Sequence, residues 1–397
     1  MARRAGRARA LDVSEDAAPR DTGSVAASVR DARTKRTTLR LVGGGTWLDA
    51  GRPVEADRSL SLSELRGVTE YEPGDFTLTV RAGTPLAEIA EVTSREGQWL
   101  TLEPSGSTGG TIGATIATAS WGPLATAYGT PRDHLLGCEV VTGVGEIVRA
   151  GGRVVKNVAG FDLARLMTGA WGTLGVITEV TMRLRAKPEV DRTLAVALEG
   201  DDEGACGGAA LWLRSTPYRP LAAELCSPAM SERIGLERRT LLLVRLGGNE
   251  ALVRAAEHAV GELAFTTAVD SSVWSRLQTA EPSAAIVLRL GTLPASTGKI
   301  WAHAARVTSD AGGWSHATVA RGIVRCILPA PRTPADIDQM RGIMNELHAP
   351  GSRVVERAPA PVWSDIPSPV ANPLSREVRR TFDPDRVLNP GILDSIA

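Results

Sequence analysis

The sequence predicts an α+β protein of two domains, a glycine-rich first domain and a second domain of alternating strands and helices. Up to residue 187, short apolar strands run directly into clusters of glycine and threonine. After residue 188 these clusters stop, and the apolar pattern follows the order β-α-β-β-α-β. The chain has 397 residues, whereas single hydrophobic cores stop growing at about 250–300 residues. Two cores are therefore expected.

The composition argues against several classes of protein. The 45 basic residues balance the 45 acidic ones, so charge favours neither nucleic acid nor an anionic membrane as the main partner. The sequence contains no run of about 18 apolar residues, so no membrane span is predicted. The basic residues 1–10 precede no apolar segment and are expected to be a frayed start. The cysteines show no C-x-x-C spacing, which favours a reducing, cytoplasmic compartment and predicts no metal site. They are Cys138, Cys206, Cys226 and Cys326.

The first glycine cluster follows a strand. Asp21 is placed to cap a helix with Val25 and Val29 on one face. A strand over Leu39–Val42 then leads into Gly43–Trp47. Consecutive glycines permit positive φ angles and converging N–H groups, which is the pattern of an anion nest for phosphates, although a hairpin turn is an alternative. The cluster is not a G-x-G-x-x-G that opens a helix, so a nicotinamide Rossmann site is disfavoured.

The second cluster follows a strand over Phe76–Val80 and a helix that Thr84-Pro85 is expected to start and that runs to Glu96. From Glu103 to Pro123 the chain holds small residues and hydroxyls with almost no charge. A solvated linker would carry charges, so we expect backbone lying against a ligand, with a tight apolar turn as the alternative. Residues 128–133 are expected to continue this loop.

The third cluster follows a predicted hairpin of 138–142 and 146–149. Asp162 can cap a short helix that ends at Gly169. The turn Gly172–Gly175 then precedes a strand, and its missing side chains let backbone approach a large polar group. The three clusters together predict that the first domain wraps one dinucleotide.

The second domain offers little chemistry. Its histidines stand alone and are expected to be surface or structural residues, and Arg321 and Arg325 are expected on a solvated edge rather than on a substrate carboxylate. Residues 377–381 are expected to form a solvated helix face, and Trp363 to lie near the cofactor or to pack the C-terminal arm. The histidines are His258, His303, His316 and His348. The predicted strands are 194–198, 221–226, 241–246 and 284–290, with helices near 206–215, 250–263 and 297–311.

Residues 20–187 resemble the FAD-binding domain of the vanillyl-alcohol oxidase (PCMH-type) flavoproteins. The shared pieces are Gly43–Thr46, Thr111–Ala114 with Ile116–Thr118 and Gly122, and Gly172–Ile177. The run Lys156–Leu163, with Val362-Trp363 and Phe382–Gly391, is similar to the smaller flavin-binding subunit (the E subunit) of bacterial glycolate oxidase.

The resemblance implies an FAD-binding domain of two α+β subdomains, a ferredoxin-like α+β cap domain and a C-terminal arm that returns to the FAD domain. The implied boundaries are 1–19 for the frayed start, 20–187, 188–355 and 356–397. The pyrophosphate would lie on the first cluster, the ribityl region on the second and the adenosine half on the third. The implied FAD-binding residues are Gly43, Gly44, Gly45, Thr46, Trp47, Thr111, Ile112, Gly113, Ala114, Gly122, Gly172, Thr173, Gly175, Val176 and Ile177.

Two departures from the family pattern matter. Relatives that tether FAD covalently carry a His after the glycines, where this chain has Thr46-Trp47, so the FAD is expected to be non-covalent. Ala119 stands where many relatives have Asn. The His-x-Gly-Asp-Gly-Asn-x-His motif of related α-hydroxy-acid dehydrogenases is missing, so no catalytic residue is predicted.

The implied function is that of an FAD-binding subunit in a 2-hydroxy-acid (glycolate-type) oxidase or dehydrogenase complex. The expected partners are a small hydroxy-acid substrate, a second flavin subunit and an iron–sulfur subunit, because this chain lacks cysteines suited to clusters. The expected location is cytoplasmic, with peripheral attachment to the inner face of the membrane through partner subunits left open. The alternatives are a stand-alone FAD oxidoreductase of another alcohol, hydroxy acid or sugar, and a non-catalytic flavin relay or scaffold subunit.

Overall fold

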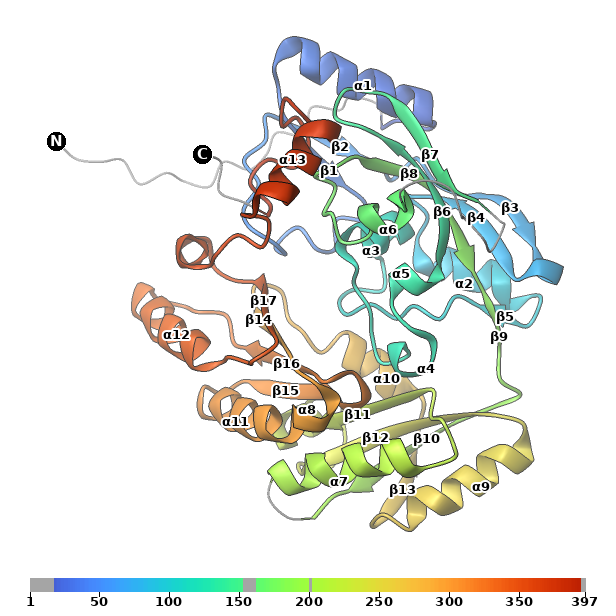
Figure 1. The fold of residues 1–397 in the computed structure, drawn as a ribbon. Helices are drawn as coiled ribbons and strands as arrows, with labels where there is room; N and C mark the ends of the chain where they lie inside the picture. The colour runs from blue at the N-terminus through green and yellow to red at the C-terminus, as the bar shows by residue number, and fades with distance from the viewer. Residues whose placement is uncertain (1–17, 153–161, 200–201, 394–397) are drawn as a thin grey trace.

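The computed structural model describes residues 18–152, 162–199 and 202–393, and Figure 1 shows two domains, one above the other. Most of the run Lys156–Leu163 lies outside the described residues. Within the described ranges, no helix is long and apolar enough to cross a bilayer. In the same ranges, no three His, Cys, Asp or Glu side chains gather as a metal site.

The first domain is built on a five-stranded antiparallel sheet with the order β3-β4-β8-β6-β7. The predicted strand after Gly175 is its central strand β8, whose alternate residues Val176, Val180 and Met182 are fully buried. A separate parallel pair, β1–β2, and a short pair, β5–β9, complete the domain. The strands are β1 (Leu39–Val42), β2 (Arg58–Ser61), β3 (Val68–Glu72), β4 (Thr77–Arg81), β5 (Gln98–Trp99), β6 (Leu135–Val141), β7 (Ile147–Gly151), β8 (Val176–Arg183) and β9 (Arg185–Ala186).

The helices of this domain cover two apolar cores. One core lies between the large sheet and the helices α2, α3 and α6, and the other joins α1 to β1 and β2. Asp21 caps α1 by accepting from Ser24 N at 2.7 Å, and Val25 and Val29 are fully buried, as predicted. Asp162 caps α6 by accepting from Arg165 N at 3.0 Å, also as predicted. The helices are α1 (Thr22–Lys35), α2 (Leu86–Ser94), α3 (Ile112–Thr118), α4 (Ala125–Tyr128), α5 (Pro131–His134) and α6 (Leu163–Met167).

Two local predictions in this domain are wrong. Thr84 does not cap α2, because its hydroxyl accepts from Gly67 N at 2.8 Å and donates to Arg81 O at 2.7 Å. The stretch 103–123 is not all loop, since it contains α3, and 128–133 contains the end of α4 and most of α5. Gly113 lets α3 lie directly on β4's end, because a Cβ there would stand 2.6 Å from Ala82 Cβ. Small residues in this stretch therefore serve helix packing.

The second domain is one antiparallel sheet of eight strands with the order β13-β10-β12-β11-β15-β16-β14-β17. The predicted β-α-β-β-α-β order occurs twice, with four strands in each unit, and the two units join through β11 and β15. The prediction that 284–290 closes a single unit is wrong, because β13 closes the first unit and β14 opens the second. The strands are β10 (Val190–Ala197), β11 (Ala222–Cys226), β12 (Leu241–Gly248), β13 (Thr266–Val269), β14 (Ile286–Gly291), β15 (Trp314–Thr318), β16 (Ile323–Leu328) and β17 (Ser352–Arg357).

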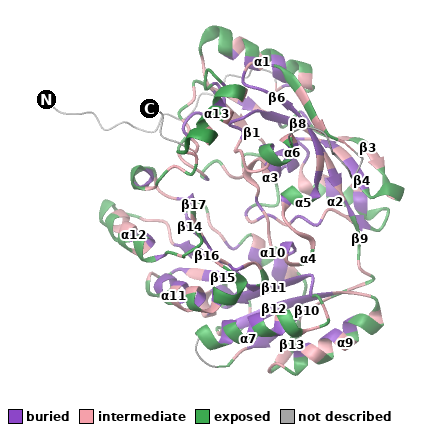
Figure 2. Cartoon of the chain, viewed as in Figure 1, coloured by how far each residue is buried: buried purple, intermediate pink, exposed green. Residues whose placement is uncertain are grey.

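The two faces of this sheet differ in character. Four long helices cover one face with an apolar core, and their outer surfaces are exposed (Figure 2). The opposite face is apolar only under two short helices and elsewhere carries buried charged residues that reach the first domain. The long helices are α7 (Asp202–Ser215), α9 (Glu250–Gly261), α11 (Thr297–Asp310) and α12 (Pro334–Glu346), and the short ones are α8 (Pro228–Arg233) and α10 (Ser272–Gln278).

The chain then returns to the first domain. After α13 (Pro373–Phe382), Leu39 N donates to Val387 O at 2.7 Å and Asn389 N donates to Leu39 O at 2.8 Å. The buried Asp383 holds this turn by accepting from Val387 N at 2.9 Å and from Leu388 N at 3.0 Å. The expected solvated face at 377–381 is interrupted, because Arg379 is only 7% exposed.

Candidate functional site

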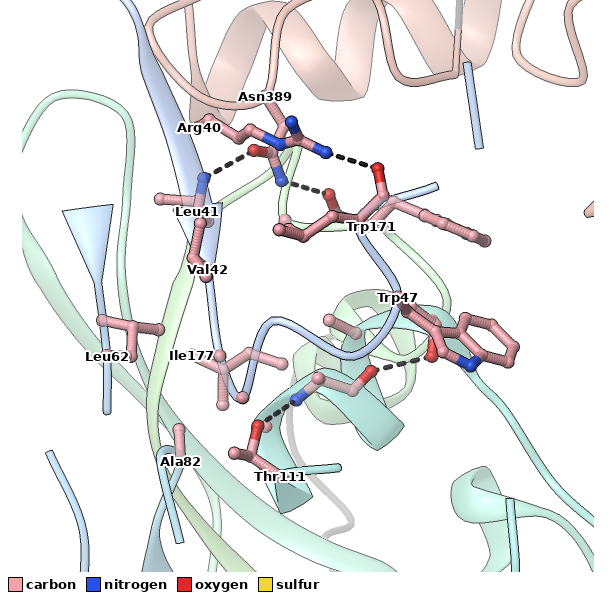
Figure 3. Close-up of a pocket in the computed structure, with 18 of the residues that line it drawn as sticks. Arg40, Leu41, Val42, Trp47, Leu62, Ala82, Thr111, Trp171, Ile177 and Asn389 are labelled. Carbon is pink, nitrogen blue, oxygen red and sulfur yellow. Dashed lines mark hydrogen bonds between the residues drawn. The ribbon is translucent and has the colours of Figure 1, made fainter. Parts of the chain in front are cut away.

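The three glycine clusters meet around one cleft, in which the space between atoms, including the open mouth, is about 880 Å³ (Figure 3). The first cluster follows β1, the second lies at the start of α3, and the third leads into β8. The tail contributes Asn389 and Ile392. Twelve of the fifteen predicted residues line the cleft, namely Gly43, Gly44, Gly45, Thr46, Trp47, Thr111, Gly113, Ala114, Gly172, Gly175, Val176 and Ile177.

The other three predicted residues do not line it. Ile112 is fully buried in the core beneath α3. The Thr173 hydroxyl donates to Ala170 O at 2.7 Å and lies on the far side of the loop. Gly122 lines a different cavity, between the domains, and a Cβ there would stand 1.9 Å from Glu103 O. These residues support the walls from behind or belong to another site.

The first cluster offers a row of unused backbone donors. In the described part of the chain, none of the five N–H groups from Gly43 to Trp47 donates to a protein acceptor. Gly45 has φ +70°, and a Cβ there would meet no atom within 4 Å. Five backbone donors in succession at a cleft, none of them used by the protein, are the arrangement that an anion nest requires.

Gly43 and Gly44 are needed for a different reason. A Cβ on Gly44 would lie 2.3 Å from Gly109 O, and one on Gly43 would lie 2.5 Å from Thr111 Oγ1. The first cluster therefore packs directly on the second, backbone against backbone. The missing side chains at these two positions make room for the neighbouring loop.

At the start of α3 the second cluster supplies shape rather than N–H donors. Ile112 N donates to Thr84 O at 3.0 Å, and Gly113 N donates to Ala82 O at 2.8 Å. Ala114 N is directed at Thr111 Oγ1 at 3.4 Å. The first N–H groups of α3 are thus satisfied within the protein, so they do not add to the nest.

The lining residues that were not predicted from the sequence include Arg40, Trp171 and Asn389. The Arg40 guanidinium donates to Leu48 O beside the nest (Figure 3). Burial lowers the pKa of Arg40, but an arginine stays charged at neutral pH. Arg40 could have been identified from the sequence, because it is an arginine inside an otherwise apolar strand. Trp171 could have been identified because it lies among the glycines of the third cluster.

Asn389 ties three segments together. Its Oδ1 accepts from Leu41 N at 2.8 Å and its Nδ2 donates to Trp171 O at 2.8 Å (Figure 3). The side chain is 6% exposed, so both bonds are largely shielded from water. One tail residue therefore fixes the distance between β1 and the third cluster.

The substitution Asn389→Ala is expected to weaken cofactor binding by up to about 30-fold, because two buried backbone groups lose their partner at about 1 kcal/mol each. Fluorescence titration of FAD into apoprotein measures this. Asn345→Ala, on an exposed residue of α12, is the matched control and should bind FAD as the wild type does. Equal affinity for the two variants would show that the tail does not shape the cleft.

A second cavity lies between the domains. The space between its atoms, including the open mouth, is about 430 Å³. Its walls are Glu103, Ser105 and Trp121–Pro123 of the first domain and residues of α10, β11 and β14–β16. His316, 8% exposed, pairs there with Glu224, with 2.7 Å between Nδ1 and Oε2.

The prediction that Arg321 and Arg325 lie on a solvated edge is wrong. Arg321 donates to Ala125 O of the first domain at 3.0 and 2.7 Å. Arg325, 7% exposed, pairs with Glu281 and with Glu356, the latter at 2.6 Å. Burial alone lowers the pKa of Arg325, but the two carboxylates raise it overall. Trp363 packs in the arm, with its Nε1 donating to Ala358 O at 3.0 Å.

Comparison with known proteins adds the family. Residues 16–151 match the model of the FAD binding domain family. The chain is 34% identical over 235 residues to glycolate oxidase subunit GlcE of Escherichia coli (strain K12), which covers 59% of this chain and 62% of that subunit. It is 25% identical to an uncharacterized FAD-linked oxidoreductase of Mycobacterium tuberculosis over 95% of this chain and 90% of that protein.

The fold is also that of a solved flavoprotein. The structure of p-cresol methylhydroxylase with substrate bound superposes with a TM-score of 0.72 at 16% identity, over 95% of this chain and 88% of that one. The match to the glycolate oxidase subunit spans about three fifths of that subunit's length. The chain therefore carries an FAD binding domain, and it is similar in sequence to a glycolate oxidase subunit and in fold to p-cresol methylhydroxylase.

Proposed function

We propose that FAD binds in the glycine-lined cleft with its pyrophosphate on the N–H groups of Gly43–Trp47. The single observation that carries this placement is the row of five unpaired donors with Gly45 open at φ +70°. Hydrogen bonds from backbone donors to a charged phosphate contribute about 1.5–3 kcal/mol each, so a few suffice for tight binding. Arg40 adds a positive charge at the same wall.

The remaining lining residues would hold the two ends of the cofactor. In this proposal Thr111, Gly113 and Ala114 line the ribityl region, and Gly172 with Gly175–Ile177 line the adenosine half. Residues 20–187 then hold the FAD, 188–355 cover its ring, and 356–397 return to close the cleft. Ile112, Gly122 and Thr173 have no direct contact with the cofactor.

We propose further that the FAD is not covalently attached, because Thr46 and Trp47 occupy the position after the glycines and neither side chain forms the usual histidyl bond to the flavin. Acid precipitation of the purified protein tests this. The flavin colour is expected in the supernatant, and its absorbance there should account for the FAD bound before precipitation. Colour that stays in the pellet would contradict the proposal.

The proposed activity is that of an FAD-binding subunit of a 2-hydroxy-acid oxidase or dehydrogenase of the glycolate type. Bound FAD supplies a two-electron acceptor for a hydride, and the protein supplies binding and orientation. The likeness to the glycolate oxidase subunit supports this class of substrate. A second flavin subunit and an iron–sulfur subunit would be its partners, since the four cysteines here are free, buried and spread over both domains.

The second candidate function is a stand-alone FAD oxidoreductase. It is favoured by the match to the M. tuberculosis oxidoreductase over nearly the full length of both chains and by the interdomain cavity. Anaerobic mixing with glycolate or D-lactate distinguishes the two. Bleaching of the flavin in the isolated chain would support the stand-alone enzyme and exclude a passive relay. Bleaching only after the partner subunits are added would support the complex.

A further inference from the structure

In the interdomain cavity, titratable side chains from the second domain face the first domain across an open space. Arg289, Arg325 and His316 lie in one row across β14, β16 and β15, because Arg325 is paired in register with both Arg289 and His316. All three line the cavity. Neighbouring strands are about 4.8 Å apart, so a small molecule can span from the first to the last of them.

His316 is held in one orientation. Its Nδ1 lies 2.7 Å from Oε2 of Glu224, and the other oxygen of that carboxylate accepts from Thr318 Oγ1 at 2.5 Å. Glu224 is fully buried, so the carboxylate is fixed by these two bonds. A carboxylate at Nδ1 places the ring proton there and leaves Nε2 as the acceptor. Nε2 has no hydrogen-bond partner among the described residues.

The other histidines of this domain differ. His303 Nε2 and His348 Nδ1 both contact Glu346 O; His303 is half-buried and His348 is exposed. His258 is 82% exposed. Only His316 of the four combines a buried carboxylate partner with a free nitrogen at a cavity. This arrangement is that of a general base held by an orienting acid.

Arg289 is held less firmly than Arg325. Arg325 is held by two buried carboxylates, Glu281 and Glu356. Arg289 has a single 3.5 Å contact, to Glu356, and its guanidinium lies 5.9 Å from the ring centroid of Trp121. Its side chain is 26% exposed. A guanidinium with free N–H groups beside a base is suited to a carboxylate that carries a hydroxyl on the next carbon.

We propose that this cavity binds a small 2-hydroxy acid, with Arg289 on its carboxylate and His316 Nε2 on its hydroxyl, so that this chain is itself catalytic. The inference rests on the proposed function. Oxidation of the substrate to a 2-oxo acid removes two electrons and two hydrogens. The hydroxyl proton would pass to His316 Nε2 and the C–O single bond would become a carbonyl. Bound FAD would supply the acceptor for the hydrogen on C2 and its two electrons. Glu224 is a positioning residue.

The test separates anion binding from proton transfer. Oxalate, which has no hydrogen to lose, is titrated into the purified flavoprotein by calorimetry and by flavin absorbance. Arg289→Met is expected to weaken oxalate binding about 30-fold or more. His316→Gln should keep the oxalate affinity within about threefold but slow flavin reduction by D-lactate or glycolate about 100-fold. His316→Ala should regain part of its rate with added imidazole, a rescue that a structural histidine would not show.

Matched controls are Arg254→Met and His258→Gln, both on exposed residues of α9, which should change neither readout. Oxalate bound equally by wild type and Arg289→Met, or no oxalate bound at all, would overturn the proposal. So would a His316→Gln variant that is reduced at the wild-type rate. A chain that binds oxalate through Arg289 but retains no flavin would instead overturn the cofactor assignment and leave the anion site standing.

Discussion

Replacing Gly44 with valine is expected to abolish FAD retention, with an affinity loss of about 100-fold or more, equivalent to about 3 kcal/mol. The reason lies in the contact between the first two clusters. A Cβ at position 44 would stand 2.3 Å from the carbonyl oxygen of Gly109. The two loops would have to separate, and the row of N–H groups would move away from the wall of α3. The measurement is the ratio of flavin to protein after gel filtration.

The control for this change is Gly74→Val. Gly74 is exposed in the turn between β3 and β4, and a Cβ there would meet nothing within 4 Å. This variant should retain FAD as the wild type does and unfold within about 0.5 kcal/mol of it. A Gly44→Val protein with full flavin content would show that the phosphates do not lie on Gly43–Trp47.

Replacing Arg325 with methionine is expected to destabilise the second domain by about 3–5 kcal/mol, the usual cost of removing one partner of a buried ion pair. Only the longer contacts of Arg289 with Glu356, at 3.5 Å, and of Arg357 with Glu281, at 3.7 Å, would remain. Arg325 lies between two carboxylates, those of Glu281, whose side chain is 2% exposed, and Glu356, at 7%. Although burial raises the pKa of Glu356, the neighbouring Arg325 and Arg289 lower it overall. Without Arg325 the two acids remain buried together. Urea unfolding, followed by tryptophan fluorescence, measures the loss.

Arg254→Met provides the comparison, because Arg254 pairs with Glu250 at 2.8 Å while 73% exposed. An exposed pair of this kind contributes about 0–1 kcal/mol, so this variant should unfold close to wild type. The double variant Arg325→Met, Glu281→Gln should recover part of the lost stability, since one of the unpaired charges is gone. Equal stability of the two single variants would mean that the interior carboxylates are solvated.

Local patterns were enough to predict much of the first domain. The cap at Asp21, the hairpin of β6 and β7 and the alternation of β8 are determined by residues near one another in sequence. The clustering of glycines likewise identified the walls of the cleft, because loops that approach each other backbone to backbone need glycine wherever they touch. The positions of the glycines in the sequence therefore mark the points at which the loops touch in the structure.

Other features depend on contacts between distant segments. The doubling of the β-α-β-β-α-β unit was missed because β13 has only four residues, none of them buried, and so lacks the apolar run of a central strand. His316 gave no signal on its own, since Glu224 lies 92 residues away. Arg321 and Arg325 look like a solvated edge until the first domain and two distant carboxylates are placed beside them.

The tail has a consequence for biosynthesis. Asn389 bonds to a strand that emerges from the ribosome almost 350 residues earlier, and the second domain is made in between. Domains tend to fold as they are synthesised, from the N-terminus onward. The eight-stranded sheet can therefore form on a nascent chain, whereas the cofactor cleft stays open on one side until translation has passed residue 389. We therefore expect FAD to be held only late in synthesis, and a chain that ends before residue 389 to fold its second domain but to retain little flavin.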